Sequence, residues 1–326
     1  MNIPSGGVSD VERIEMQYPF LYFTRNLYLD GGGAGKFNGG TGSFRIYMIY
    51  GSQDCSVSYR PYSRLPEGVG IFGGNPAGIG GIRAVYQTVG ASLMERLQSG
   101  QYPVQPDQIE RDGWGIVAHP AEIKGRVNLP EFTIVADFVA GGGGYGDPIE
   151  RQPEAVAKDV RRRIVSSRIA EEVFGVVLNQ DFPAPDNAAT LKRRQEIREE
   201  RMREGKTFSG ATSSLSDAVR RSTAWQQILK FHEHLAIAKN GQTEAIRCIR
   251  CGHLFCQKDE NYKLYALRRE RDLYDLAQSL VPSGESYLGG YLEYYCPVCA
   301  TLLQVDSFCD AFPDSKEPLY DFYQEP

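Results

Sequence analysis

Glycine is concentrated in three stretches of the first half of this 326-residue chain. The stretches span residues 31–42, 68–81 and 141–146, and the last begins with four consecutive glycines. Glycine costs backbone entropy and offers no side chain to pack, so such stretches cannot form long helices. Two readings stay open for them. They are either loops that cradle a phosphate or a partner's backbone, or a scaffold whose segments approach too closely to tolerate a Cβ atom.

The phosphate-loop reading is the weaker one. The stretch "DGGGAGKFNGG" contains Lys36, but Phe37 stands where a GxxxxGK[ST] loop needs a hydroxyl residue. The stretch "GGGGYGDP" has no lysine, and the helix predicted after it begins only at Pro153. A phosphate held by that helix stays a weak alternative. The favoured interpretation is a set of extended, polyproline-II-like segments that pack side by side.

Composition and charge exclude several classes of protein. The formal net charge of −5 argues against a general nucleic-acid binder. No apolar run approaches the roughly 18 residues that a membrane helix needs. The first twenty residues show no basic segment followed by an apolar one, so we expect no secretory signal and a cytoplasmic protein. Hydrophobic residues make up 41%, which is enough for a sizeable core.

Strand signals dominate the first half of the chain. Residues 43–50, "SFRIYMIY", and 132–140, "FTIVADFVA", are rich in β-branched and aromatic residues and predict strands. One short helix is expected within residues 83–100, although Gly90 weakens that prediction.

Helical signals begin at Pro153. A second short helix is expected with Ser166 or Ser167 as its cap and Gly175 as its stop, followed by a short strand, "GVVL". Residues 186–205 predict a highly charged helix, which is either solvated or clamped on a partner. Residues 206–218 resemble a linker, and residues 223–241 predict one more amphipathic helix.

The expected fold class is therefore α+β. A β-rich and glycine-rich domain with polyproline-II-like segments covers residues 1–180, a helical connector covers 181–245, and a zinc-ribbon domain covers 246–326. The cysteines support this division, because six of the seven lie after residue 247.

Two CxxC pairs carry the strongest chemical signal. Cys248 and Cys251 form one pair, and Cys296 and Cys299 form the other. Each pair places two thiolates on one tight turn, and two such turns can close a tetrahedron around zinc. Four protein ligands leave no open position, so a structural zinc is expected.

Other candidate side chains receive weaker interpretations. Cys256 and His253 could replace a zinc ligand, whereas Cys55 and Cys309 are read as ordinary small residues. His232 and His234 are two apart, do not match HExxH, and are read as part of a solvated or capped helix face. His119 is read as structural. Asp147 is expected to cap or turn its loop, and Arg151 to reach a partner or an anion.

The glycine-rich half resembles hydantoinase B-type proteins. The stretch "YPFLYFTRNLYLDGGGAGKFNGGTGSFRIY" is similar to the family's D-S-G-G-A-G-K-x-R-G-G block, with Gly31 in place of its Ser and Asn38 in place of its Arg. The stretch "GGGGYGDPIERQPEAVAKDVRRRIVSSRIAEEVFGVVL" closely resembles the family's C-terminal signature, and "DNAATLKRRQEIR" its tail. The resemblance covers roughly residues 10–200.

The zinc module has a different resemblance. The stretch "LEYYCPVCATLLQVD" is similar to the end of the zinc-binding gamma subunit of acetone carboxylase, whose pattern is C-P-G-C-G-T-L-L. Val298 and Ala300 replace its glycines, so a different local turn geometry is expected.

Together the two resemblances imply an acetone or acetophenone carboxylase-type subunit. Such enzymes are expected to be active only as complexes, with ATP and Mg²⁺ or Mn²⁺ on hydantoinase A-like subunits. They activate bicarbonate and an enolised ketone by phosphorylation before the carbon–carbon bond forms. The N-terminal half of the hydantoinase B sequence, with its metal motif, is expected on another chain, and no catalytic residue is assigned here. A subunit of a hydantoinase or oxoprolinase-type amidohydrolase, and a pure assembly subunit, stay as alternatives.

Overall fold

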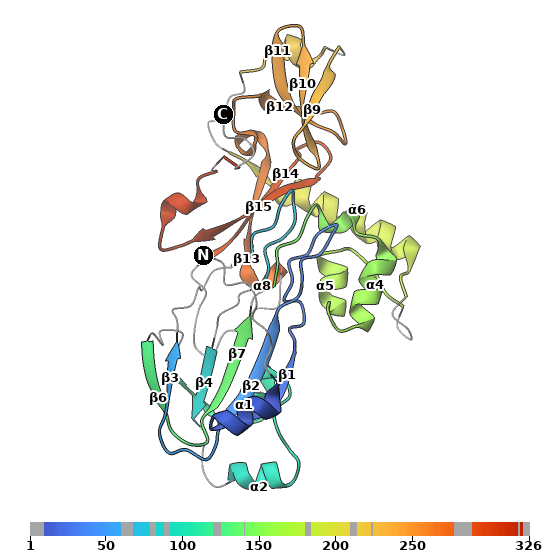
Figure 1. Cartoon of the computed structure of the whole chain (residues 1–326). Helices are drawn as coiled ribbons and strands as arrows, with labels where there is room; N and C mark the ends of the chain where they lie inside the picture. The colour runs from blue at the N-terminus through green and yellow to red at the C-terminus, as the bar shows by residue number, and fades with distance from the viewer. Residues whose placement is uncertain are drawn as a thin grey trace.

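The computed structural model describes residues 10–59, 68–78, 83–87, 92–119, 125–139, 141–179, 184–208, 214–222, 224–276, 289–318 and 320–321. The molecule is elongated, with one group of sheets at each end (Figure 1). Glycine-rich segments run between these ends, and a group of helices lies beside them (Figure 1). Among the residues described, no helix has the length and apolar character needed to cross a membrane.

The N-terminal end is built on a five-stranded antiparallel sheet with strand order β1-β2-β7-β4-β5. Its strands are β1 (Phe20–Leu27), β2 (Ser43–Ile49), β7 (Ile134–Val139), β4 (Arg83–Gln87) and β5 (Ile116–His119). A second pair consists of β3 (Cys55–Tyr59) and β6 (Gly125–Leu129), and the helices here are α1 (Val11–Gln17), α2 (Ser92–Gln98) and α3 (Pro106–Arg111). The two strands predicted from β-branched and aromatic content are confirmed as β2 and β7.

The helix predicted within residues 83–100 is only partly correct. Helix α2 occupies Ser92–Gln98, but Arg83–Gln87 forms strand β4 and pairs with both β7 and β5. Val85 and Tyr86 are almost fully buried in that inner position. Pairing on both edges supplies this strand with backbone hydrogen bonds that a local reading of its sequence cannot anticipate.

The glycine-rich segments form a bundle of closely packed backbones, here called the glycine bundle (residues 31–40, 68–78 and 141–146). Gly33 N–H donates to Gly142 O at 2.9 Å, and Ile71 N–H donates to Gly144 O at 2.9 Å. A Cβ atom on Gly74 would lie 2.0 Å from Gly144 O, a distance that no real side chain tolerates. The glycines therefore serve backbone-to-backbone packing, which supports the scaffold reading over the phosphate loop.

A small helical layer covers the bundle. It comprises the 3₁₀ turn η1 (Pro148–Glu150), α4 (Pro153–Arg161), α5 (Ser167–Glu172) and α6 (Asn187–Glu204). Ser166 and Asp186 cap α5 and α6 by accepting backbone N–H bonds at 3.2 and 3.0 Å. Gly175, with φ +62°, follows α5 as expected. The three predicted helices are confirmed, but "GVVL" is not a strand: only Leu178 makes an isolated bridge, to Pro185.

The C-terminal end carries two four-stranded sheets. One has the order β12-β11-β10-β9, with β9 (Gln226–Lys230), β10 (Leu235–Asn240), β11 (Thr243–Cys248) and β12 (Leu254–Gln257). The other has the order β15-β14-β13-β8, with β8 (Lys206–Thr207), β13 (Leu267–Asp272), β14 (Gly289–Tyr295) and β15 (Leu302–Cys309). Short elements complete this end: α7 (Asp217–Arg220), η2 (Tyr262–Tyr265), α8 (Leu273–Leu276) and η3 (Pro313–Lys316).

The helix predicted over residues 223–241 is wrong. This part of the expected helical connector forms β9 and β10, and β10 continues into β11 through a two-residue loop. Asn240 pairs with Thr243, and Gly241 starts the loop with φ +60°. A glycine at that position of a two-residue loop is a strong hairpin signal. The helical spacing of apolar residues in this stretch does not correspond to a helix.

The predicted limit between residues 245 and 246 falls within a paired strand, whereas the limit between 180 and 181 lies outside the described residues. Strand β11 begins at Thr243, so the β10–β11 hairpin spans the position expected to separate connector and zinc ribbon. The predicted linker also contributes to a sheet, because Lys206 of β8 pairs with Arg268 of β13. The division of the chain into three domains stays a prediction.

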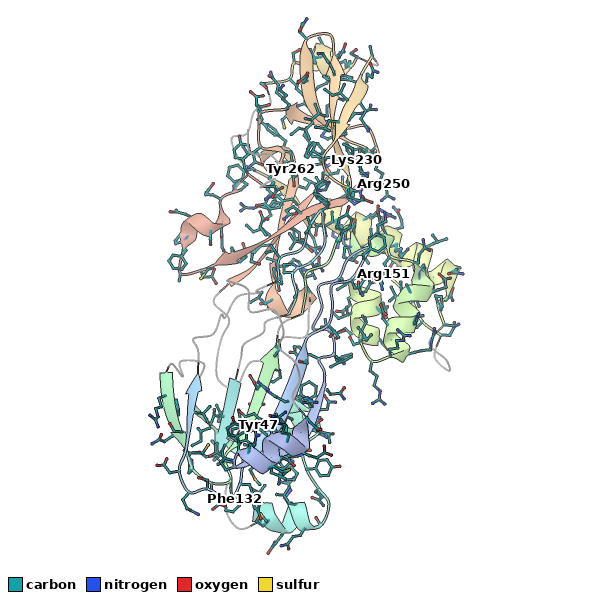
Figure 2. The ribbon with its side chains drawn as sticks, viewed as in Figure 1. Tyr47, Phe132, Arg151, Lys230, Arg250 and Tyr262 are labelled. Carbon is teal, nitrogen blue, oxygen red and sulfur yellow. The ribbon has the colours of Figure 1, made fainter. Side chains whose placement is uncertain are left out.

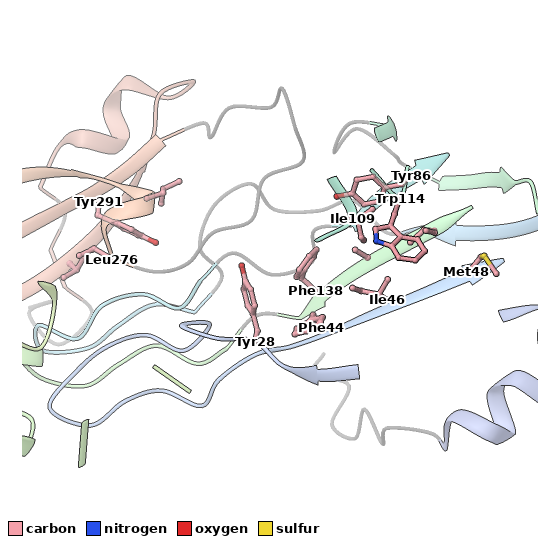
Figure 3. Packing of buried hydrophobic residues seen from close by; sticks show 14 of the residues in the cluster. Tyr28, Phe44, Ile46, Met48, Tyr86, Ile109, Trp114, Phe138, Leu276 and Tyr291 are labelled. Atoms are coloured by element: carbon pink, nitrogen blue, oxygen red, sulfur yellow. The ribbon is translucent and has the colours of Figure 1, made fainter. Parts of the chain in front are cut away.

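One buried cluster includes side chains from both ends of the molecule (Figure 3). Phe44 and Phe138 come from the N-terminal sheet, whereas Leu276 and Tyr291 come from the C-terminal end, and all four are almost fully buried. The two ends therefore share part of their hydrophobic core.

Replacing Gly39 by alanine tests the glycine bundle. A Cβ atom there would lie 1.9 Å from Gly142 O, so we expect a loss of about 2–3 kcal/mol in the free energy of unfolding. Gly40→Ala is the matched control, because nothing lies within 4 Å of a Cβ atom at that position. Denaturant unfolding of both variants measures the difference. Equal stability of the two variants would contradict close backbone packing.

Candidate metal centre

The two CxxC pairs lie on turns of nearly the same geometry, here called the first knuckle (248–253) and the second knuckle (296–301). In the first, Gly252 N–H donates to Cys248 O at 2.9 Å, and Cys248 N–H to His253 O at 2.8 Å. In the second, Ala300 N–H donates to Cys296 O at 2.9 Å, and Cys296 N–H to Thr301 O at 3.0 Å. The residue after each second cysteine has positive φ, +80° for Gly252 and +54° for Ala300. Ala300 thus adopts the left-handed backbone conformation that Gly252 has in the first knuckle.

The four sulfur atoms come together at the tips of these knuckles. The Sγ atoms of Cys248, Cys251, Cys296 and Cys299 all lie within 4.8 Å of one another. Cys248 Sγ lies 3.8 Å from Cys299 Sγ, and Cys251 Sγ lies 3.6 Å from Cys296 Sγ. A tetrahedral zinc ion with Zn–S bonds of about 2.3 Å requires sulfur separations of about 3.8 Å. The cluster is therefore compatible with a zinc site.

Hydrogen bonds between the thiols distribute their protons unevenly. Contacts with Cys248 and Cys296 lower the pKa of the Cys299 thiol far below its usual range. The hydrogen bond with Cys296 lowers the pKa of Cys248, but its contact with Cys299 and its burial raise that pKa to about 12. A metal ion must replace the remaining protons, so metal affinity is expected to fall as the pH falls.

The alternative ligands lie outside the cluster. Cys256 donates through Sγ to Glu260 O at 3.7 Å, and the ring of His253 packs against that of Phe255 with centroids 4.9 Å apart. Cys55 and Cys309 are buried free thiols elsewhere in the fold. Within the described residues, the only group of three or more metal-binding side chains this close together is the four-cysteine cluster.

His232 and His234 lie in the turn between β9 and β10, not on a helix. The expectation that they are solvated is wrong, because they are only 2% and 6% exposed. His232 Nε2 lies 2.9 Å from Leu303 O, and its Nδ1 accepts the His234 backbone N–H at 2.9 Å. Burial lowers the pKa of His232 to about 3, so its ring is neutral. His232 therefore serves to fasten this turn to β15.

A buried ion pair connects the second knuckle to the glycine bundle and α6. Arg201 donates from both terminal nitrogens to Asp147, at 2.8 and 3.0 Å, and from Nη1 to Ala300 O at 3.1 Å. The Leu302 N–H completes the contact by donating to Asp147 Oδ2 at 3.0 Å. Burial raises the pKa of Asp147, but the Arg201 guanidinium outweighs this effect and holds the pKa below its ordinary value. Asp147 is therefore ionised at neutral pH.

Asp147 and Arg151 both make contacts within the chain. Asp147 caps η1 as predicted, by accepting the Ile149 N–H at 3.2 Å. Arg151 binds Asp159 at 2.7 Å, so one side of its guanidinium already has an intramolecular carboxylate. Sequence reasoning missed Arg201 altogether. It belongs to a strongly charged helix, and nothing in that pattern distinguishes it from solvated neighbours.

Both halves of the chain match known families. Residues 1–148 match the family model of hydantoinase B/oxoprolinase, and residues 223–323 match that of the acetone carboxylase gamma subunit. The resemblances stated from the sequence are thereby confirmed.

Several curated relatives resemble part of this chain. The acetone carboxylase alpha subunit of Xanthobacter autotrophicus is 30% identical over 211 residues, covering 61% of this chain and 27% of the relative. The acetophenone carboxylase delta subunit of Aromatoleum aromaticum is 23% identical, covering 61% and 30%. The caprolactamase subunit beta of Pseudomonas jessenii is 29% identical, covering 57% and 28%. The chain thus spans less than a third of each relative.

A solved structure also resembles this chain. A nucleotide-free structure of acetone carboxylase, from work on ATP-dependent acetone carboxylation, superposes with a TM-score of 0.56 at 27% sequence identity. The match covers 62% of this chain and 28% of that one.

Removing one thiol tests the metal centre. We expect wild-type protein to contain about one zinc per chain, and Cys248→Ser to lose most of it, because a tetrahedral site requires all four ligands. Cys256→Ala is the matched control: Cys256 is buried close to the first knuckle but lies outside the cluster. Elemental analysis of the purified proteins measures the metal. Full zinc content in Cys248→Ser would contradict the assignment.

Breaking the buried ion pair tests the connection between knuckle and bundle. Arg201→Ala leaves Asp147 buried without its partner and should cost about 3–5 kcal/mol of unfolding free energy. Arg203→Ala, on the exposed side of the same helix, should change it by less than about 0.5 kcal/mol.

The same pair predicts a pH dependence. Because the folded-state pKa of Asp147 is lowered, its contribution is fully present above the unfolded-state value of about 3.9 and is lost as the pH falls through the folded-state pKa. Urea unfolding between pH 7 and pH 3 should show a steeper loss in wild type than in Asp147→Asn. Parallel curves would contradict the assignment.

Proposed function

We propose that this chain is a subunit of a multisubunit ATP-dependent carboxylase that joins bicarbonate to a ketone or a related carbonyl compound. The observation that carries the proposal is the presence of two family matches in one chain. A hydantoinase B/oxoprolinase match covers residues 1–148, and an acetone carboxylase gamma match covers residues 223–323. Relatives named as acetone and acetophenone carboxylase subunits support the same choice.

The role proposed for this chain is that of a scaffold with a structural zinc module. Zinc bound by Cys248, Cys251, Cys296 and Cys299 would have four thiolate ligands and no position open to substrate or water. Such an ion stabilises the knuckles and supplies no Lewis-acid chemistry. The second knuckle contacts the glycine bundle through the Asp147–Arg201 pair, so the metal would help to hold the scaffold surface in place.

The proposal assigns the energy-consuming step to partner chains. ATP with Mg²⁺ or Mn²⁺ would bind to hydantoinase A-like subunits, and a further chain would carry the N-terminal half of the hydantoinase B sequence. This assignment follows the family resemblance and the absence of a GxxxxGK[ST] loop from the sequence. We place the complex in the cytoplasm, where thiolates stay reduced and available to zinc.

A second candidate function is supported by one comparison. The similarity to a caprolactamase subunit favours a subunit of an ATP-dependent, ring-opening amidohydrolase. That alternative accounts for the glycine-rich half equally well, but it offers no reason for a module that matches the acetone carboxylase gamma subunit. A pure assembly subunit differs from both only if no side chain of this chain reaches the reaction centre.

Copurification from the native host distinguishes these functions. We expect the tagged chain to bring down hydantoinase A-like subunits and a chain that carries an N-terminal hydantoinase B half, identified by mass spectrometry. The complex should release phosphate from ATP only when a ketone and bicarbonate are both present, and ¹³C from bicarbonate should appear in a carboxylate product. Phosphate release that needs a lactam or hydantoin but not bicarbonate would replace the proposal by the amidohydrolase alternative.

A further inference from the structure

Five arginines gather where the helical layer meets the first knuckle. We call this place the arginine junction and define it by Glu150, Arg151, Arg194, Arg198, Arg201, His234 and Arg250. Arg250 lies between the two cysteines of the first knuckle and binds Glu150 at 3.0 Å. Glu150 is the last residue of η1 and directly precedes Arg151. Figure 2 labels Arg151 and Arg250. The junction therefore combines the turn after the glycine bundle, α6 and the zinc module.

Helical spacing brings three of these arginines to one face of α6. Arg194, Arg198 and Arg201 are separated by four and three residues, so their side chains emerge on the same side. Arg194 Nη2 donates to Arg151 O, and Arg201 binds Asp147 at 2.8 Å. Arg198 lies between them in sequence and on the same face, so its guanidinium is directed towards the same turn.

The positive charge at the junction is only partly compensated. Arg151, Arg201 and Arg250 each bind a carboxylate, at 2.7, 2.8 and 3.0 Å. Arg194 donates to the carbonyl groups of Phe174 and Arg151 and to no carboxylate among the described residues. Arg198 makes neither a hydrogen bond nor an ion pair within the described part of the chain, although it is half-buried. Among the described residues, these two neighbouring arginines therefore have no carboxylate partner.

Unpartnered nitrogen atoms gather at the same place. In the part of the chain that the structure describes, seven buried side-chain nitrogen or oxygen atoms have no hydrogen-bond partner. The nitrogens among them are Arg151 Nε, Arg198 Nε and His234 Nε2, and all three belong to the junction. His234 Nε2 lies 3.9 Å from Glu150 Oε2, too far for a hydrogen bond. Buried arginine N–H groups normally find an acceptor, so Arg151 Nε and Arg198 Nε point to an acceptor at the junction.

The electrostatic environment agrees with this geometry. Burial, and then the charge of Arg250, lower the pKa of Arg198, while burial and the charge of Arg198 lower the pKa of Arg194. Each cation therefore has a higher free energy here than in water. An anion placed among them would relieve both effects.

We propose that the arginine junction binds a small inorganic oxyanion, phosphate or bicarbonate, with Arg198 as its principal ligand. Guanidinium groups present parallel N–H donors that match the oxygen spacing of such ions. No described residue occupies the donors of Arg198, and Arg194 can supply a further donor. The oxyanion site rests on these contacts alone, whereas the choice of bicarbonate as one of the two ions rests on the function proposed above.

Anion-dependent stability of the full-length chain tests the site. Thermal unfolding is followed in a zwitterionic buffer while phosphate or bicarbonate is added at constant ionic strength. We expect a saturable rise in Tm for the wild type, since a ligand that binds only the folded state stabilises it. Arg198→Gln should weaken the apparent affinity at least tenfold. The control Arg203→Gln, whose side chain is exposed on the same helix, should behave like the wild type.

Loss of Arg198 should not destabilise the chain when the anion is absent. Because Arg198 has no partner among the described residues, Arg198→Gln should unfold at the wild-type temperature or above it without phosphate and bicarbonate. Calorimetric titration with each ion alone shows which of the two binds. If the Gln variant does not fold, Arg198→Lys keeps the charge but not the parallel donors and should bind several-fold more weakly.

Three results would overturn the proposal. The first is an equal rise in Tm for wild type and Arg198→Gln, and the second is an equal effect of chloride. The third is no binding of either ion by the wild type, which would leave water, or an acidic side chain of a partner subunit, as the acceptor for these donors.

Discussion

At Asp147 a carboxylate without exposed surface meets the guanidinium of Arg201 and the backbone N–H groups of Ile149 and Leu302. These groups come from the end of the glycine bundle, from α6 and from β15, directly after the second knuckle. A buried charge is tolerated only when its partners are fixed in place, because desolvation costs several kcal/mol per ion. The ion pair therefore sets the relative position of the glycine bundle, the charged helix and the zinc module.

The glycine bundle makes this arrangement possible. Gly73 has φ +92°, and a Cβ atom there would lie 2.3 Å from Leu302 O, so the bundle touches the strand that follows the second knuckle. Backbones this close can satisfy each other's hydrogen bonds without sheet geometry, as Gly144 N–H does with Asn75 O at 2.9 Å. The four-cysteine cluster is thus packed against the glycine bundle and is not a separate appendage.

Sequence motifs predicted the structure correctly where the interaction joins residues that are close in sequence. Ser166 and Asp186 cap helices because their side chains reach the backbone N–H three residues on. The same kind of reasoning failed at residues 223–241, where an apparent helical period hid a hairpin whose Gly241 has φ +60°. The charge pattern of α6 also gave no means of distinguishing Arg201 from Arg198, because both belong to the same highly charged helix. Whether a helical arginine is buried against Asp147 or left without a counterion depends on which segment packs over it.

The sequence by itself determined the chemistry that each segment could support. Two CxxC turns can bring four cysteine sulfur atoms around one metal ion, and runs of glycine can pack backbone to backbone or stay open. The tertiary structure decided which of these options is realised. Residues more than fifty positions apart, such as Asp147 and Arg201, acquire their roles from burial and from one another's charge, and neither quantity exists until the chain has folded.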